Sequence, residues 1–167
     1  MPQIGHIISI AERVLEEFGG RNIFETAENS GANVWFKDLG GLKGFYLCEN
    51  QFRYIVINEN LDDITQAVVC AHELGHDMLH RELSAGGIRE NTLLLSGNKT
   101  EREANLFAAA VLISDDEIIA EAEYQSDAAA LAKCLGFPQE LVLYKLETLN
   151  FKGFDFNLGE VENDFLK

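Results

Sequence analysis

The chain has 167 residues, 47% of them apolar, which is enough to bury the core of a domain and argues against wholesale disorder. It carries 28 acidic and 13 basic residues, a net charge of −15. This charge argues against direct binding to nucleic acid or to an anionic membrane, because phosphate is bound mainly by Lys and Arg.

The first third of the chain contains two helix patterns followed by three strand patterns. Apolar residues spaced by three and four predict a helix over 7–18 that ends at Gly19 and Gly20, and a shorter helix is expected over 23–30. The three runs rich in β-branched and aromatic residues cover 33–36, 44–49 and 53–58. We expect the last two to form a hairpin.

Two long helices are predicted next. Asp62 or Asp63 can cap the first, whose apolar residues form one stripe. The stripe consists of Ile64, Ala67, Val68, Ala71, Leu74 and Met78. A polar, glycine-containing loop is expected over roughly 84–99. Thr100 would then cap the second helix, with Glu103 in the capping-box position three residues later.

The C-terminal part of the chain is expected to be mainly helical. Residues 126–150 read as two short helices around Gly136 and Pro138, in outline like a helix-turn-helix. Only Lys133 and Lys145 are basic there, so we expect this pair to pack on the core and not on DNA. The elements together predict an α+β fold with a small three-stranded antiparallel or mixed sheet, in a single domain over 1–167.

Several features predict a cytoplasmic protein. The three cysteines, Cys48, Cys70 and Cys134, are an odd number without a CxxC pair, which favours reduced thiols over a disulfide framework. Charged residues interrupt the first apolar run, so it is not typical of a signal peptide. No stretch approaches the ~20 apolar residues of a membrane span.

The segment VVCAHELGHDMLH, residues 68–80, contains three of the four histidines. His72 and His76 are four residues apart and share one face of a helix, so both imidazoles can reach one Zn²⁺ ion. Glu73 would face the open position of the metal as a general base. Gly75 would let a neighbouring element approach closely. The alternative is a chance HExxH pattern in a core helix.

A catalytic zinc needs a third protein ligand, and the residues leave several candidates. Leu79 and Glu82 stand where a metzincin would have glycine and histidine, which excludes that class. For His80 we favour a supporting role or a place in the cleft wall over ligation. We prefer Glu103, which falls on the same side as Phe107; the alternative is a capping-box glutamate bonded to Thr100. Glu101 is expected to lie off the inward face.

The motif HELGHDMLH followed by EREANLFAA resembles the ImmA/IrrE family of zinc metallopeptidases, cytoplasmic proteins often encoded on phages and mobile elements. YIVINENL and ALAKCLGFPQELVLYKLETL are also similar to that family, so the resemblance runs over roughly 7–150. One departure is that the second helix ends in LIS (112–114), where family members commonly have an LMP-like ending. This difference concerns the fit of the substrate more than the ligands.

The resemblance implies a zincin-like fold with His72, His76 and Glu103 as zinc ligands and Glu73 as catalytic base. It also implies an endopeptidase that cuts a protein substrate, a helix-turn-helix transcriptional repressor. The donor to the oxyanion is left open among His80, Tyr124 and Tyr144. Two alternatives remain: a non-catalytic regulator that binds a repressor or partner through the same cleft, and a structural zinc domain. The oligomeric state is not indicated by the sequence.

Overall fold

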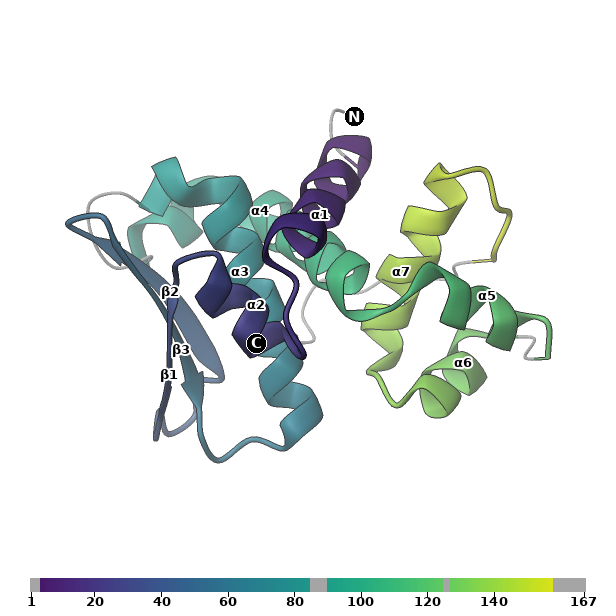
Figure 1. The fold of residues 1–167 in the computed structure, drawn as a ribbon, viewed down its shortest axis with the longest axis horizontal. Coiled ribbons are helices and arrows are strands. Elements are labelled where there is room, and N and C mark those ends of the chain that lie inside the picture. The colour runs from purple at the N-terminus through teal and green to yellow at the C-terminus, as the bar shows by residue number, and fades with distance from the viewer. Residues whose placement is uncertain (1–3, 85–89, 125–126, 158–167) are drawn as a thin grey trace.

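Helix α3 (Asp63–Ser84) is the central element of the fold, with the sheet on one side and helix α4 on the other (Figure 1). The computed structural model describes residues 4–84, 90–124 and 127–157. Asp62 caps α3 as predicted, because its side chain accepts a hydrogen bond of 3.0 Å from the backbone N–H of Thr65.

The sheet has three strands, β1 (Asn33–Lys37), β2 (Gly44–Glu49) and β3 (Phe52–Asn58), in the order β1-β3-β2. β2 and β3 form the predicted antiparallel hairpin, whose turn residues Asn50 and Gln51 both have positive φ. β1 pairs parallel with β3. The sheet is therefore mixed, and the predicted α+β class is confirmed.

One face of the sheet packs on α3. Tyr46, Ile55 and Ile57 are buried there together with Val68 and Val69 of the helix. At Gly44 the approach is so close that a Cβ atom would lie 2.4 Å from the Cγ1 of Val69. This close packing therefore positions α3 relative to the sheet.

Helices α1 (Ile4–Phe18) and α2 (Ile23–Asn29) agree with the sequence prediction, except that α1 begins three residues earlier. Asn22 caps α2 by accepting a hydrogen bond of 2.9 Å from the N–H of Glu25. α2 packs on α3 and β1, and α1 packs on α4. The two helices thus cover the core from the N-terminal side.

Helix α4 (Glu90–Leu112) begins ten residues before the predicted start at Thr100. The expected loop over 84–99 is therefore wrong for residues 90–99, while residues 85–89 lie outside the described part of the chain. The loop was predicted because this stretch is polar and contains glycine, but a glycine costs only about 1 kcal/mol inside a helix, which tertiary contacts can outweigh. Because Thr100 lies inside α4, it is not an N-cap.

Three helices follow α4 in the described part of the chain: α5 (Asp115–Ala122), α6 (Ala128–Leu135) and α7 (Gln139–Phe151). Gly136, with φ of 74°, ends α6, and α7 packs on α4 and α6. The mainly helical C-terminal half is as predicted; that residues 126–150 belong with the core in one domain over the whole chain stays a prediction. Within the described ranges, no helix has both the length and the apolar character needed to cross a bilayer.

Candidate metal centre

His72, Glu73 and His76 lie on the buried part of α3, and each is at most 5% exposed. The contact between α3 and α4 is the most extensive contact between two elements of the fold. The HExxH segment is therefore enclosed between the sheet and α4, in the interior of the fold. This burial alone is compatible with a core helix, so the partners of the histidines decide what the segment is.

Gly75 is the point of closest approach between α3 and α4, as the sequence predicted. A Cβ atom there would lie 3.1 Å from the Cδ1 of Phe107 and 3.2 Å from the Cα of Ala104. The backbone of α4 can come this near only because position 75 has no side chain. Glu101, one helical turn before Ala104, is thereby brought against the histidines.

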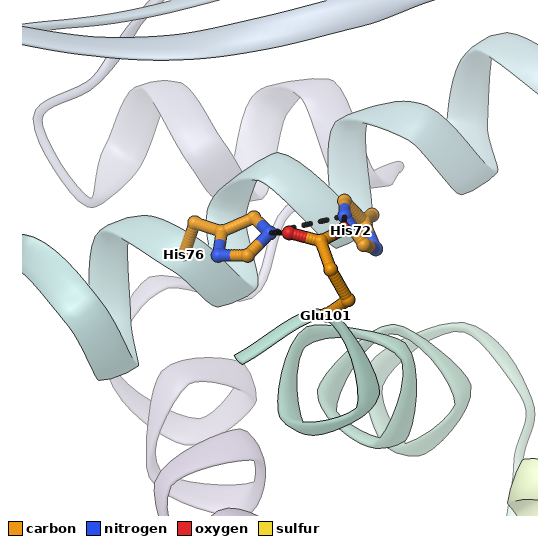
Figure 2. Close-up of side chains that lie close together, drawn as sticks. All are labelled: His72, His76 and Glu101. Atoms are coloured by element: carbon orange, nitrogen blue, oxygen red, sulfur yellow. Dashed lines mark hydrogen bonds and ion pairs between the residues drawn. The ribbon is translucent and has the colours of Figure 1, made fainter. Parts of the chain in front are cut away.

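Three side chains converge at this crossing, as Figure 2 shows. The Nε2 atoms of His72 and His76 lie 3.0 Å apart. The Glu101 carboxylate lies 3.2 Å from the Nε2 of His72 and 3.4 Å from the Nε2 of His76. Two atoms bound tetrahedrally to one zinc ion at about 2.0–2.1 Å are about 3.3–3.4 Å apart. The group therefore has the chemistry and the spacing of a metal site.

The environment of Glu101 favours its charged form. Burial by itself would raise the pKa of this carboxyl group, but hydrogen bonds to His72 and His76 and the charge of those rings outweigh the burial. The pKa of Glu101 therefore lies well below its ordinary value of 4.5. An ionised carboxylate beside two imidazoles is a donor set that divalent transition metals prefer.

Asn105 orients His72 from the side away from Glu101. Its side-chain oxygen lies 2.8 Å from the Nδ1 of His72. An amide oxygen only accepts, so the Nδ1 of His72 carries a hydrogen, and Nε2, toward Glu101, is the ring atom on which a metal could take the place of a proton. The sequence analysis missed Asn105. The available signal was a polar residue four positions after Glu101, on the same face of a buried helix.

Glu103, the preferred third ligand, is not brought into this group. Its Oε2 lies 2.9 Å from the Nε2 of His80, whose Nδ1 lies 3.0 Å from the Nδ1 of His76. The capping alternative is not met either, because Thr100 lies inside α4. Residues two positions apart point roughly 160° apart around a helix, so Glu101 and Glu103 flank the buried face of α4 on opposite sides.

The three side chains considered as hydrogen-bond donors to the oxyanion lie in different environments. Tyr144 is completely buried in α7, whereas Tyr124, after α5, is 81% exposed. His80 is 8% exposed and lies between His76 and Glu103. His80 is thus in direct contact with the histidine group.

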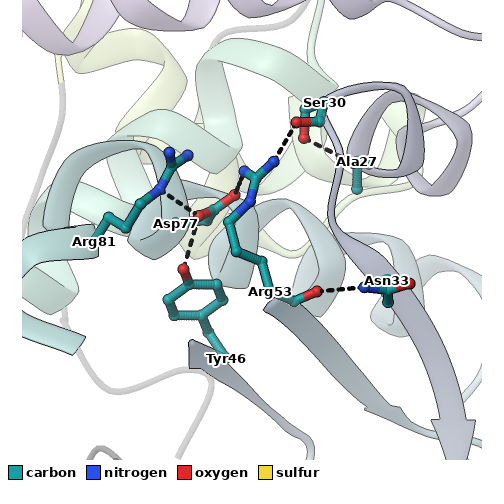
Figure 3. A network of polar contacts seen from close by, with 7 residues as sticks. All are labelled: Ala27, Ser30, Asn33, Tyr46, Arg53, Asp77 and Arg81. Carbon is teal, nitrogen blue, oxygen red and sulfur yellow. Dashed lines mark hydrogen bonds and ion pairs between the residues drawn. The ribbon is translucent and has the colours of Figure 1, made fainter. Parts of the chain in front are cut away.

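A second polar network lies on the sheet side of α3, as Figure 3 shows. The carboxylate of Asp77 accepts hydrogen bonds of 2.8 Å from the Tyr46 hydroxyl, 2.6 Å from Arg53 and 3.0 Å from Arg81. Arg53 also donates to the backbone oxygen of Ser30. Burial, followed by the hydrogen bond to Asp77, raises the pKa of Tyr46. This network ties α3 to β2, to β3 and to the end of α2.

Comparison with known proteins identifies the family. The model of the IrrE N-terminal-like domain matches residues 27–147. The chain is 33% identical to immunity region protein 2 of Bacillus phage phi105 over 140 residues, which is 83% of this chain and 88% of that protein. It is 31% identical to the metallopeptidase ImmA of Bacillus subtilis (strain 168) over 106 residues, 62% of this chain and 61% of ImmA.

The matched range contains the whole cluster of His72, His76 and Glu101 together with Glu73. A phage protein and a named metallopeptidase are both among the relatives. The chain is therefore a member of the phage-related ImmA/IrrE family of metallopeptidases.

Proposed function

We propose that the chain is a zinc-dependent endopeptidase in which His72, His76 and Glu101 hold the metal and Glu73 is the catalytic base. Glu101 thereby replaces Glu103 of the sequence prediction. The observation that carries the proposal is the convergence of two imidazole Nε2 atoms and one carboxylate within 3.4 Å of one another. Two histidines and a glutamate, with a fourth position for water, are typical of catalytic zinc.

Each residue has a distinct task in the proposed reaction. A zinc ion in the site supplies positive charge that polarises the scissile carbonyl group and makes a water molecule more acidic. Glu73, next to His72 on the buried part of α3, accepts the proton of the attacking water at its carboxylate. It then passes this proton to the nitrogen of the leaving amine. Asn105 keeps the ring of His72 oriented throughout.

The proposed substrate is a transcriptional repressor of the helix-turn-helix type. Support comes from the relatives, one named for a phage immunity region and one named ImmA, because immunity is maintained by repressors. The net charge of −15 favours a protein substrate over nucleic acid. The three cysteines are free, which suits the reducing cytoplasm in which such a repressor would act.

Co-expression with a helix-turn-helix repressor tests the proposal. The wild type should carry about one zinc per chain by elemental analysis and should cleave the repressor. Glu73→Gln should retain zinc but lose cleavage, because an amide cannot accept the proton of the water molecule. Glu82→Gln, at the exposed end of the same helix, is the matched control and should cleave normally.

The outcomes separate the alternatives. Zinc-free protein after purification without chelator would overturn the metal site. Cleavage by Glu73→Gln at the wild-type rate would overturn the role of Glu73. Loss of repressor activity without cleavage, equal in the wild type and in Glu73→Gln, would instead establish a non-catalytic regulator.

A further inference from the structure

The three histidines of α3 form a row of hydrogen bonds that ends on α4. The Nδ1 of His76 lies 3.0 Å from the Nδ1 of His80, and the Nε2 of His80 lies 2.9 Å from the Oε2 of Glu103. The side chains of His76 and His80 are 0% and 8% exposed, and that of Glu103 is 16% exposed. Water therefore has little access to this row.

The row has one consistent assignment of hydrogens when both rings are neutral. The carboxylate of Glu103 can only accept, so the Nε2 of His80 carries the hydrogen that it donates. The Nδ1 of the neutral His80 ring is then an acceptor, and the hydrogen between the two rings belongs to the Nδ1 of His76. The lone pair of His76 is thereby left on Nε2, the atom that lies 3.4 Å from Glu101.

The backbone of α3 changes at this point. His80 has φ of −130° and ψ of 18°, outside the helical range, so the regular helix is interrupted there. The interruption belongs to the residue whose ring lies between His76 and Glu103. It distinguishes His80 from a residue that merely continues the helix toward the surface.

We infer that His80 and Glu103 are a positioning pair, which acts through His76 by fixing its tautomer and ring orientation for the metal. This inference rests on the proposed metal site. It gives the two glutamates of the segment EREAN different tasks. Glu101 contacts the metal, and Glu103 orients the ring of His80, which in turn orients His76. His72 is supported in the same manner by a single residue, Asn105.

Reversal of the row shows why an acceptor at position 80 matters. If the Nδ1 of His80 carried a hydrogen, it would donate to the Nδ1 of His76. The hydrogen of the His76 ring would then move to Nε2 and occupy the position of the lone pair. Glu103 prevents this reversal, because its carboxylate requires a hydrogen on the Nε2 of His80.

Cobalt(II)-loaded full-length protein provides a readout that does not depend on activity. The paramagnetic ion shifts the ring N–H protons of bound histidines far downfield, so His72 and His76 should each give one exchangeable proton signal. His80→Leu should lose the His76 signal, or make it exchange rapidly, while the signal of His72 persists as the internal control. EDTA should remove the metal about 10–100-fold faster than from the wild type.

Conservative variants separate positioning from packing. His80→Asn places an amide oxygen near the position of Nδ1 and should restore both the signal and the slow release. Glu103→Ala should accelerate release less than His80→Leu, and it carries the test alone if His80→Leu does not fold. Lys99→Ala removes an exposed ion pair of 3.8 Å to Glu103 and should release metal at the wild-type rate.

The inference would be overturned by a protected His76 signal and an unchanged rate of metal release in both His80→Leu and Glu103→Ala. It would also be overturned if His80→Asn released metal as fast as His80→Leu. Failure of the proposed function is distinguishable, because the wild type itself would then bind no cobalt. If Glu103→Ala abolished cobalt binding while Glu101→Ala did not, Glu103 would be a ligand and not a positioning residue.

Discussion

The neighbouring residues His76 and Asp77 belong to two polar regions on opposite sides of α3, and these regions are built differently. Around Asp77 one negative charge is paired within the protein with two cations, Arg53 and Arg81. Around His76 and His72, the two Nε2 atoms lie 3.0 Å apart and both face the carboxylate of Glu101. The first region pairs its charges within the protein, whereas the second has the composition of a group that could hold a metal ion.

A third polar region, between α1, α5 and α7, follows the pattern of the first. The ammonium group of Lys145, 3% exposed, pairs with Asp115, which also pairs with Lys152, and Lys152 contacts Glu12. Two cations and two anions balance there. Pairing of buried charges within the protein thus indicates a structural network, while two imidazoles that converge on a carboxylate indicate a binding site.

The largest expected effect comes from breaking the region around Asp77. Asp77→Asn leaves the Arg53 side chain, 15% exposed, without its negative partner. Loss of one member of a buried pair should lower the free energy of unfolding by about 3–5 kcal/mol. Urea denaturation of metal-loaded protein measures this loss. Arg81→Ala is the control: Arg81 is 48% exposed, so about 0–1 kcal/mol is expected, and equal losses would refute the distinction.

Substitutions in the group of His72, His76 and Glu101 should change the affinity for metal. Glu101→Ala should weaken zinc binding by more than about 100-fold, beyond the ~10–100-fold typical of a lost supporting residue, because a direct bond is removed. Competition with a chromophoric chelator measures the dissociation constant. Glu103→Ala is the matched control, with a smaller loss. The reverse order would restore Glu103 as the ligand that the sequence analysis preferred.

Gly75→Ala should lower both the stability and the zinc affinity, because it changes the crossing of α3 and α4. The added methyl group would meet Phe107 at 3.1 Å and the Ala104 backbone at 3.2 Å. Overpacking should cost about 1–3 kcal/mol, and displacement of α4 should also weaken zinc binding by moving Glu101. Gly41→Ala, where nothing lies within 4 Å of the new atom, should change neither. Destabilisation without loss of affinity would show that the crossing does not position Glu101.

The smallest effect is a dependence of stability on pH. Burial raises the pKa of Asp115, but hydrogen bonds from Lys145 and Lys152 outweigh it and hold the pKa below the ordinary 3.8. A depressed carboxyl pKa gives stability that is complete above 3.8 and is lost as pH falls through the lower, folded value.

The difference in urea midpoint between wild type and Asp115→Asn should therefore be largest at neutral pH and shrink below pH 3.8. Asp116→Asn, on the exposed side of α5, is the control and should shift the midpoint little at either pH. A difference that stays constant down to acid pH would contradict the role given to the Asp115 carboxylate.

The elements with strong periodicity were predictable from the sequence. The three strands, the hairpin, α3 and the histidine pair depend on local patterns, and Gly75 was correctly interpreted as a point of close approach. The start of α4 was not predictable, because Gly97 and Asn98 are typical of loops but are only mildly unfavourable in a helix.

The choice between the two glutamates shows where local patterns stop being sufficient. Glu101 and Glu103 both flank the buried face of α4, so a helical period identifies each as a candidate. The crossing of α4 over α3 decides which flank meets His72, and this crossing depends on Gly75 and Ala104, distant in the sequence. Phe107, which guided the prediction, lies at the same crossing and does not by itself distinguish the two flanks. The pairing of Tyr46 with Asp77 is likewise invisible locally.

The Gly75 crossing has a consequence for how the chain holds together. His76 and Glu101 lie about 25 residues apart, so a zinc ion shared by them would close a loop as a covalent cross-link does. For a loop of this length, the loss of chain entropy in the unfolded state corresponds to about 3–4 kcal/mol. Such an ion would therefore cross-link α3 and α4. Its removal would lower the melting temperature and would also abolish catalysis.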